Sequence, residues 1–186
     1  MSEQEVTKQT LDNFVQDAAY LADEAEALKV VIESVPYAVT PEGGMSIFNK
    51  LRLINHAQHS YFRRVMESVF SENSTLRLTS VAHYTDTFES DPDDEADVES
   101  VLQLIIKNRT SFLSMIDKFP FTSWERTLVN EEGDTITLLD FAREMIRDER
   151  KLLKEIADLV MIYQKEREQQ REIDNKAASR QRIADL

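Results

Sequence analysis

The sequence predicts an all-α protein that folds as an antiparallel up-down four-helix bundle. Its 186 residues are enough for one domain with a full hydrophobic core and short for two. Only 3 Gly and 4 Pro occur, so the chain has little material for the many tight turns of an all-β fold. Four long segments carry apolar residues at intervals of three and four, which is the pattern of an apolar helix face. An up-down bundle is the economical way for four such faces to share one core.

We expect the first helix to run from about Thr7 to Ser34 and to stop before Pro36. A turn region rich in Pro and Gly follows, and Ser46 is a suitable N-cap for a second helix that reaches Phe70. The inward stripe of the first helix holds Leu11, Phe14, Val15, Ala18, Leu21, Ala22, Ala25 and Ile32. The inward stripe of the second helix holds Ile47, Leu51, Ile54, Gln58, Tyr61, Phe62, Val65 and Val69.

The stretch from Ser71 to Ser100 is less regular, and residues 86–100 are strongly acidic. We expect a solvated loop whose Asp and Glu residues suit the positive end of the dipole of the next helix. That third helix should span roughly Asp94 to Lys118. Its inward face holds Val98, Val101, Leu102, Ile105, Arg109, Phe112 and Ile116.

Residues 119–137 connect the third helix to the fourth and are expected to form a small hairpin or an irregular lid. Thr137 is a candidate N-cap, and Asp140 is placed to bond back to it in the manner of a capping box. The fourth helix begins at Leu138 and should continue past Tyr163.

Beyond the fourth apolar stripe the chain becomes strongly charged. We therefore expect one bundle domain over residues 1–165, followed by a charged helical extension or tail over residues 166–186. Few apolar residues remain there to bury a helix, so the extension either frays in solution or docks on a partner. We favour packing against a second copy of the chain, which predicts a homodimer.

Composition excludes several classes of partner. The formal net charge of -13 repels the phosphates of nucleic acids and disfavours anionic membrane surfaces. The absence of Cys excludes disulfides, thiolate nucleophiles and Cys-ligated zinc. The first ten residues lack the pattern of a signal peptide, and no apolar run approaches the ~20 residues that cross a bilayer. These observations predict an acidic, cytoplasmic protein with neither a nucleic-acid nor a membrane partner.

The chain resembles the DinB-like (YfiT-like) proteins over roughly residues 10–160, most specifically in its second half. The features that carry this resemblance are Asn108 with Arg109 on the third helix, Ser123 with Trp124 in the connection, the turn at residues 133–135 and the helix from Leu138. The resemblance implies a bundle, often dimeric, with a divalent metal held by three His between the second and fourth helices. It also implies that some relatives are thiol-dependent transferases and isomerases.

The residues at the positions of these metal ligands differ from the family pattern. The HxxxH pattern of the last helix falls on Asp148 and Leu152, and the remaining His falls near Leu53 or Ile54. Leucine and isoleucine cannot ligate a metal. We therefore expect no metal and no other cofactor. His56 and His59 are three residues apart on the second helix. The alternative to a protein without metal is a metal site reduced to His59 and Asp148. The simpler interpretation is that these histidines lie at the surface or at the boundary between surface and core. The sequence places His56 toward solvent, His59 at the edge of the stripe and His83 without an evident partner.

Polar residues inside the apolar stripes are the most informative candidates for a site. Glu149 lies near the centre of the fourth stripe, Arg109 in the third and Gln58 in the second. Because a buried charge is costly unless paired, we expect Glu149 to face Arg109, with Gln58 or His59 completing the hydrogen bonds. This cluster either fixes the helix register or lines a pocket for a small polar ligand. The candidate ligand-binding residues are Gln58, His59, Arg109, Asp148 and Glu149, with Trp124 as a cap.

Three functions follow from these patterns. The first is a DinB-like module without metal that binds a small ligand or another protein. The second is a metal-dependent enzyme of the thiol-transferase type that uses the reduced site. The third is a structural or oligomerisation protein whose charged extension recognises another helix.

Overall fold

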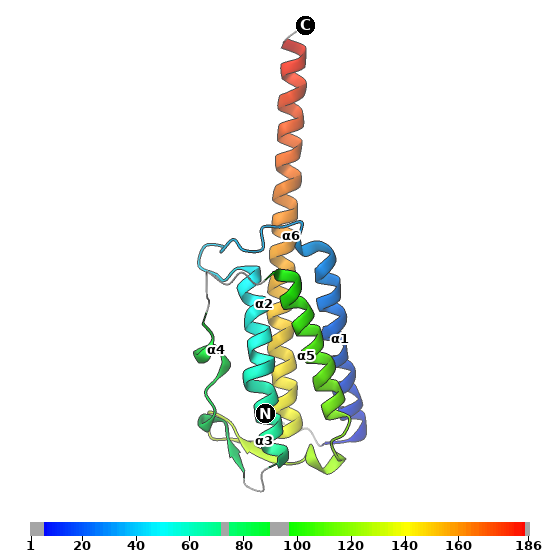
Figure 1. The fold of residues 1–186 in the computed structure, drawn as a ribbon, viewed down its shortest axis with the longest axis vertical. Helices are drawn as coiled ribbons and strands as arrows, with labels where there is room; N and C mark the ends of the chain where they lie inside the picture. Colours follow the sequence, from blue (N-terminus) through cyan, green and yellow to red (C-terminus); the bar gives the residue numbers. More distant parts are fainter. Residues whose placement is uncertain (1–5, 72–74, 90–96, 185–186) are drawn as a thin grey trace.

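The computed structural model describes residues 6–71, 75–89 and 97–184, with side chains described as far as residue 177. Four long helical segments form a bundle (Figure 1). They are α1 (Lys8–Ile32), the continuous segment α2 (Ile47–His56), η1 (Ala57–Phe62) and α3 (Arg63–Ser71), then α5 (Val98–Ile116) and α6 (Leu138–Ala184). The shorter elements are β1 (Leu76–Arg77), η2 (Leu78–Ser80), α4 (Tyr84–Thr87), η3 (Phe121–Ser123), β2 (Thr127–Val129) and β3 (Thr135–Thr137). The all-α bundle is confirmed, with a small sheet added at one end.

The inward stripes predicted from the sequence form the core of this bundle. Side chains from all four long segments are almost completely buried in it, including Ala18, Leu51, Leu102 and Ile156. Burial of apolar surface stabilises a fold by about 25 cal/mol per Å², so this shared core is the main force that holds the helices together. Val15 and Ala22 of the first predicted stripe lie at its edge and are not part of the buried core.

The order of helix directions differs from a simple up-down bundle. Polar contacts join α1 to α6 in parallel register: Arg143 to the carbonyl of Thr10 at 3.2 Å, Arg150 to Asp17 at 3.1 Å and Arg167 to the carbonyl of Ser34 at 2.8 Å. In contrast, α2 is antiparallel to α6, because Lys50 pairs with Glu155 near one end and Tyr61 packs on Phe141 nearer the other. Figure 1 shows the resulting order, in which α1 and α6 run one way and α2 and α5 run the other.

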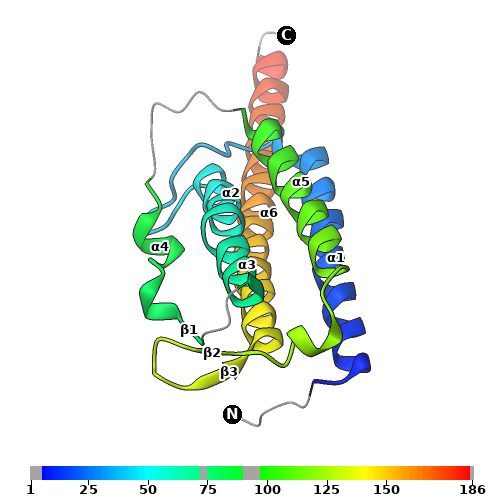
Figure 2. The ribbon, with the colours of Figure 1, turned by 60° about the horizontal axis from the view of Figure 1, so that its bottom comes forward.

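This order exists because the chain between α3 and α5 crosses back along the bundle instead of turning tightly. Figure 2 shows β1, η2 and α4 rising beside the α2 side of the bundle. Here β1 pairs in parallel with β2, which in turn pairs antiparallel with β3. The stretch predicted to be less regular contains short defined elements over residues 76–87, and of the predicted solvated loop only residues 86 and 87 fall in one of them, α4. Residues 90–96, the central part of the acidic stretch, lie outside the described residues.

Helix ends follow the predicted caps. The hydroxyl of Ser46 accepts a hydrogen bond from the amide of Asn49 at 3.1 Å. The amide of Asp140 donates to the hydroxyl of Thr137 at 3.1 Å, and that hydroxyl donates to the Asp140 carboxylate at 2.8 Å. Asp140 thus bonds back to the side chain of the cap and not to its backbone, as a full capping box would require. The connection before α6 contains the hairpin β2–β3, one of its two predicted forms.

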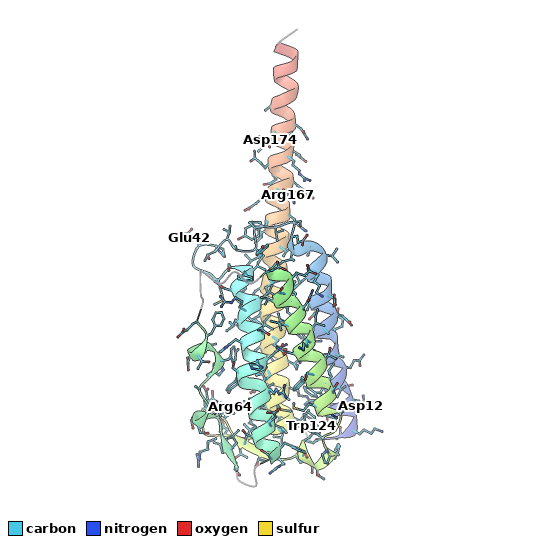
Figure 3. All side chains as sticks on the ribbon, viewed as in Figure 1. Asp12, Glu42, Arg64, Trp124, Arg167 and Asp174 are labelled. Carbon is cyan, nitrogen blue, oxygen red and sulfur yellow. The ribbon has the colours of Figure 1, made fainter. Side chains whose placement is uncertain are left out.

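The extension that the sequence predicts after the bundle continues helix α6 as far as Ala184. Val160 is the last buried residue of α6, and the described side chains from Lys165 onward are exposed. Figure 3 shows Arg167 and Asp174 on the part of α6 that projects beyond the other helices. No helix in the described part of the chain is long and apolar enough to span a membrane.

Candidate functional site

A buried ion pair lies at the centre of the bundle. Arg109 of α5 donates from Nη2 to Oε2 of Glu149 on α6, and their side chains are only 3% and 2% exposed. The predicted pairing of these two residues is confirmed. Burial lowers the pKa of Arg109 to about 9. The guanidinium also lies over the ring of Phe112, with 5.3 Å between its central carbon and the ring centroid.

The hydrogen bonds around this pair are incomplete. Arg109 Nε, Glu149 Oε1 and Gln58 Oε1 are buried, and none has a hydrogen-bond partner in the described residues. The expectation that Gln58 or His59 completes the hydrogen bonds of the pair is therefore wrong for the described part of the chain. An unsatisfied buried donor or acceptor costs about 1–3 kcal/mol, so the arrangement is poorly optimised for stability.

A narrow cleft opens beside the ion pair, between η1 and α5. We name it the Arg109 cleft. Its volume is only about 30 Å³. Its polar lining comes from Gln58, His59, Arg63, Asn108, Arg109 and Ser111, and its apolar lining from Phe62, Phe112, Met115 and Met145. The lining thus combines apolar walls with a few polar groups, as small-molecule sites in proteins usually do.

The segment η1 shapes the α2 side of this cleft because it is a π-helical turn within an otherwise α-helical segment. The wider turn brings Gln58 and Phe62 inward, both buried, while His59 is exposed at the mouth. Short π-helical turns inside α-helices occur frequently at functional sites, which agrees with this position. The sequence periodicity did not predict this turn.

Three of the predicted site residues do not line the Arg109 cleft, namely Glu149, which pairs with Arg109, and Trp124 and Asp148. Trp124 is 1% exposed and packs against Phe14 and Phe119, at centroid distances of 5.3 and 5.8 Å. It does not line the cleft and is buried in the core. Asp148 is exposed and lines a different cleft on the other side of Met145.

This second hollow, which we name the acidic cleft, has a volume of about 440 Å³. It lies between η1, the crossover segment with α4, the β2–β3 turn and the first turns of α6. Its carboxylates are Glu131, Glu132, Asp134, Glu144 and Asp148, and its aromatic walls include Tyr61, Tyr84 and Phe141. Sequence reasoning missed this cleft, because its walls come from four segments that are distant in the chain.

The crossover segment between α3 and α5, which sequence reasoning also missed, changes the surroundings of His56 and His83. His56 is half-buried, because the crossover segment covers it: Thr87 lies 2.9 Å from its Nε2, and the ring of Phe88 packs beside it. His83 does have partners, since its Nδ1 lies 2.7 Å from the hydroxyl of Thr85 and its ring packs on Tyr61. The prediction of a solvent-facing His56 and an unpartnered His83 is therefore wrong.

A metal site of the kind implied by the resemblance does not fit the residues present. In residues 6–71, 75–89 and 97–184, no group of three His, Cys, Asp or Glu side chains could hold one metal ion. His59 lines the Arg109 cleft, whereas Asp148 lines the acidic cleft, so neither cleft contains both residues of the reduced site.

Comparison with known proteins identifies the fold. A protein-family search and a search of curated proteins find no match to the sequence. Among solved structures, YfiT from Bacillus subtilis matches with a TM-score of 0.69 and 13% identity, over 86% of this chain and 90% of that chain. That protein is described as a probable metal-dependent hydrolase with an unusual four-helix bundle topology. The chain is thus a four-helix bundle with a crossover connection. More particularly, it has the fold of YfiT, and a likeness at this identity shows the fold alone.

Glu144 makes stability depend on pH in a predictable direction. Burial, with smaller contributions from the carboxylates of Asp148, Asp140 and Glu132, raises its pKa above the usual 4.5, and Arg147 opposes this. A carboxyl group with a raised pKa in the folded state stabilises fully below pH 4.5, and this contribution is lost as the pH rises through the folded-state value.

We therefore expect Glu144→Gln to unfold at higher urea concentration than the wild-type protein at pH 7, and the difference between the two to shrink toward pH 4. Urea unfolding followed by circular dichroism at several pH values measures this. A constant difference over the whole range would show that Glu144 does not titrate abnormally.

Proposed function

We propose that this protein is a small-molecule-binding module and that its ligand occupies the Arg109 cleft. The observation that carries the proposal is the incomplete hydrogen bonding at Arg109 and Gln58, both of which are buried and line a cleft. Buried polar groups are nearly always hydrogen-bonded, so an exception beside a cleft calls for an explanation. A ligand that supplies the missing hydrogen bonds is such an explanation.

The free atoms indicate the chemistry of this ligand. Arg109 Nε donates a hydrogen bond and Gln58 Oε1 accepts one, so the polar end of the ligand must accept and donate at neighbouring atoms. A primary carboxamide or a protonated carboxylic acid does both. The phenylalanine and methionine walls favour an apolar body. Both free atoms are closed to water, so the ligand must displace a side chain on entry, and the unbranched Met115 and Met145 are suited to this.

Replacement of Gln58 tests the proposal through two opposite effects. Gln58→Leu removes a buried acceptor without a partner, and we expect the free energy of unfolding to rise by about 1 kcal/mol. The same change should abolish the rise in unfolding temperature that benzamide, or benzoic acid in an acidic buffer that keeps it protonated, causes in the wild-type protein.

Gln103→Leu is the matched control, because Gln103 is exposed on α5 and bonds only to Glu99. It should leave both quantities near their wild-type values. If Gln58→Leu destabilises the fold, or if neither probe raises the unfolding temperature of the wild-type protein, the proposal is wrong.

The alternatives from the sequence have less support. The likeness to a probable metal-dependent hydrolase concerns the fold, and the described residues hold no trio of metal ligands. Contact between the α6 extension and a second copy of the chain stays a prediction. Exposed Met161, Ile162 and Ile173 would be its apolar contacts.

A further inference from the structure

The acidic cleft has an excess of negative charge that nothing in its walls neutralises. Five carboxylates line it, and no Lys or Arg belongs to its described lining. Among the described residues, none of the five makes an ion pair, although the neighbouring Arg147 acts on Glu144 from outside the cleft. Like charges held together destabilise a fold unless a cation joins them. A cationic ligand would relieve this repulsion.

The shape of the cleft argues against a single metal ion. The carboxylates come from two places, the β2–β3 turn (Glu131, Glu132 and Asp134) and α6 (Glu144 and Asp148), on either side of a cavity of about 440 Å³. No three of the described acidic or histidine side chains converge enough to hold one ion. Charges that are spread along a cavity of this size match a ligand whose positive charges are also spread out.

The aromatic wall provides an independent observation. Tyr61 and Tyr84 are 4% and 7% exposed and line the cleft, and their hydroxyls, which have no hydrogen-bond partner among the described residues, are not enclosed in the core but open into the cleft. Burial raises the pKa of Tyr61 to about 12, and the carboxylates of Glu131 and Glu144 act in the same direction. Asp148 contributes in the same way, after burial, to the raised pKa of Tyr84. The two phenols and the carboxylates therefore face the same space.

We propose that the acidic cleft binds a linear organic polycation of the alkylpolyamine class. The ammonium groups would donate hydrogen bonds to Glu144 and Asp148 at one end and to the carboxylates of the β2–β3 turn at the other. The alkyl segments and the charge between them would lie against Tyr61, Tyr84 and Phe141, where aromatic faces attract cations. This site is distinct from the Arg109 cleft in location and in charge, although Phe62 and Met145 line both clefts.

Isothermal titration calorimetry of the full chain with spermidine tests this inference. We expect saturable binding of one spermidine per chain, weakened about tenfold or more in Glu144→Gln/Asp148→Asn, which removes two charge-assisted hydrogen bonds. The matched control is Glu172→Gln/Asp174→Asn, which makes the same change in charge on the exposed extension of α6 (Figure 3). It should bind spermidine as the wild-type protein does. Asp148→Asn alone changes an exposed residue, so it provides a variant that folds even if the double variant does not.

Three outcomes would overturn the inference. These are that spermidine does not bind, that both double variants lose affinity equally, or that at matched ionic strength Mg²⁺ competes with spermidine in the titration as well as spermine does. The last two would mean attraction to the acidic surface in general. Gln58→Leu should leave spermidine binding unchanged. The proposal for the acidic cleft can therefore fail or hold independently of the function proposed for the Arg109 cleft.

Discussion

Replacing Glu149 by Leu alone should lower the free energy of unfolding by about 3–5 kcal/mol, because it leaves the Arg109 guanidinium charged, buried and unpaired. Arg109→Leu should cost a similar amount, since it strands the Glu149 carboxylate. Both side chains are almost completely inaccessible, so solvent cannot take over the lost interaction. Urea unfolding followed by circular dichroism measures the loss.

The double variant Arg109→Met/Glu149→Leu should recover most of this loss and reach about the wild-type stability, because apolar side chains of similar volume often replace a buried ion pair without penalty. The exposed pair of Arg63 and Glu67 is the control, since its side chains are 53% and 52% exposed. Glu67→Leu should change the free energy of unfolding by about 0.5 kcal/mol or less. If the double variant is as unstable as either single variant, the pair contributes more to stability than the mutual neutralisation of its two charges.

The same double variant separates the two interpretations of the ion pair. If the pair fixes helix register, the double variant should lose sharp cooperative unfolding, because an all-apolar core permits several packings. If the pair serves a ligand, the double variant should unfold cooperatively and lose the response to benzamide. The incomplete hydrogen bonding at Arg109 and Glu149 favours the second outcome, because a purely structural pair would gain stability from additional partners.

The ion pair was predictable from sequence because of a local rule. A charged residue within an apolar helical stripe must face inward, and two such residues of opposite sign in one core must meet. Arg109 and Glu149 satisfy this rule without knowledge of the topology. The same reasoning assigned Gln58 to the core correctly, although it could not predict that its side-chain oxygen lacks a partner.

The direction of each helix was not predictable in this way, because periodicity gives a helix face and carries no information on chain direction. The acidic cleft depends on that direction. Tyr84 and His83 reach Tyr61 only because the chain returns along the bundle after α3. A long acidic stretch between two helices gave no local signal for this return.

Trp124 shows the limit of reasoning from residue type, and its replacement is the second large effect that we expect. Trp124→Ala should lower the free energy of unfolding by about 3–5 kcal/mol, the usual cost of deleting a large buried aromatic side chain. The side chain packs on Phe14 of α1 and on Phe119, while its carbonyl accepts a hydrogen bond from the amide of Leu139 at 3.3 Å. It therefore joins the connection before α6 to two other helical segments.

Phe121→Ala is the matched control, because Phe121 lies in the same short turn and is 41% exposed. It should cost about 0.5 kcal/mol, as surface substitutions usually do. The milder Trp124→Phe removes the indole Nε1, which is buried without a partner, and should cost clearly less than Trp124→Ala. Since Trp124 does not line the Arg109 cleft, Trp124→Phe should keep the response to benzamide. If a folded Trp124→Phe variant loses this response, Trp124 contributes to ligand binding after all. The ligand would then have to reach past Phe112 into the core around Phe14.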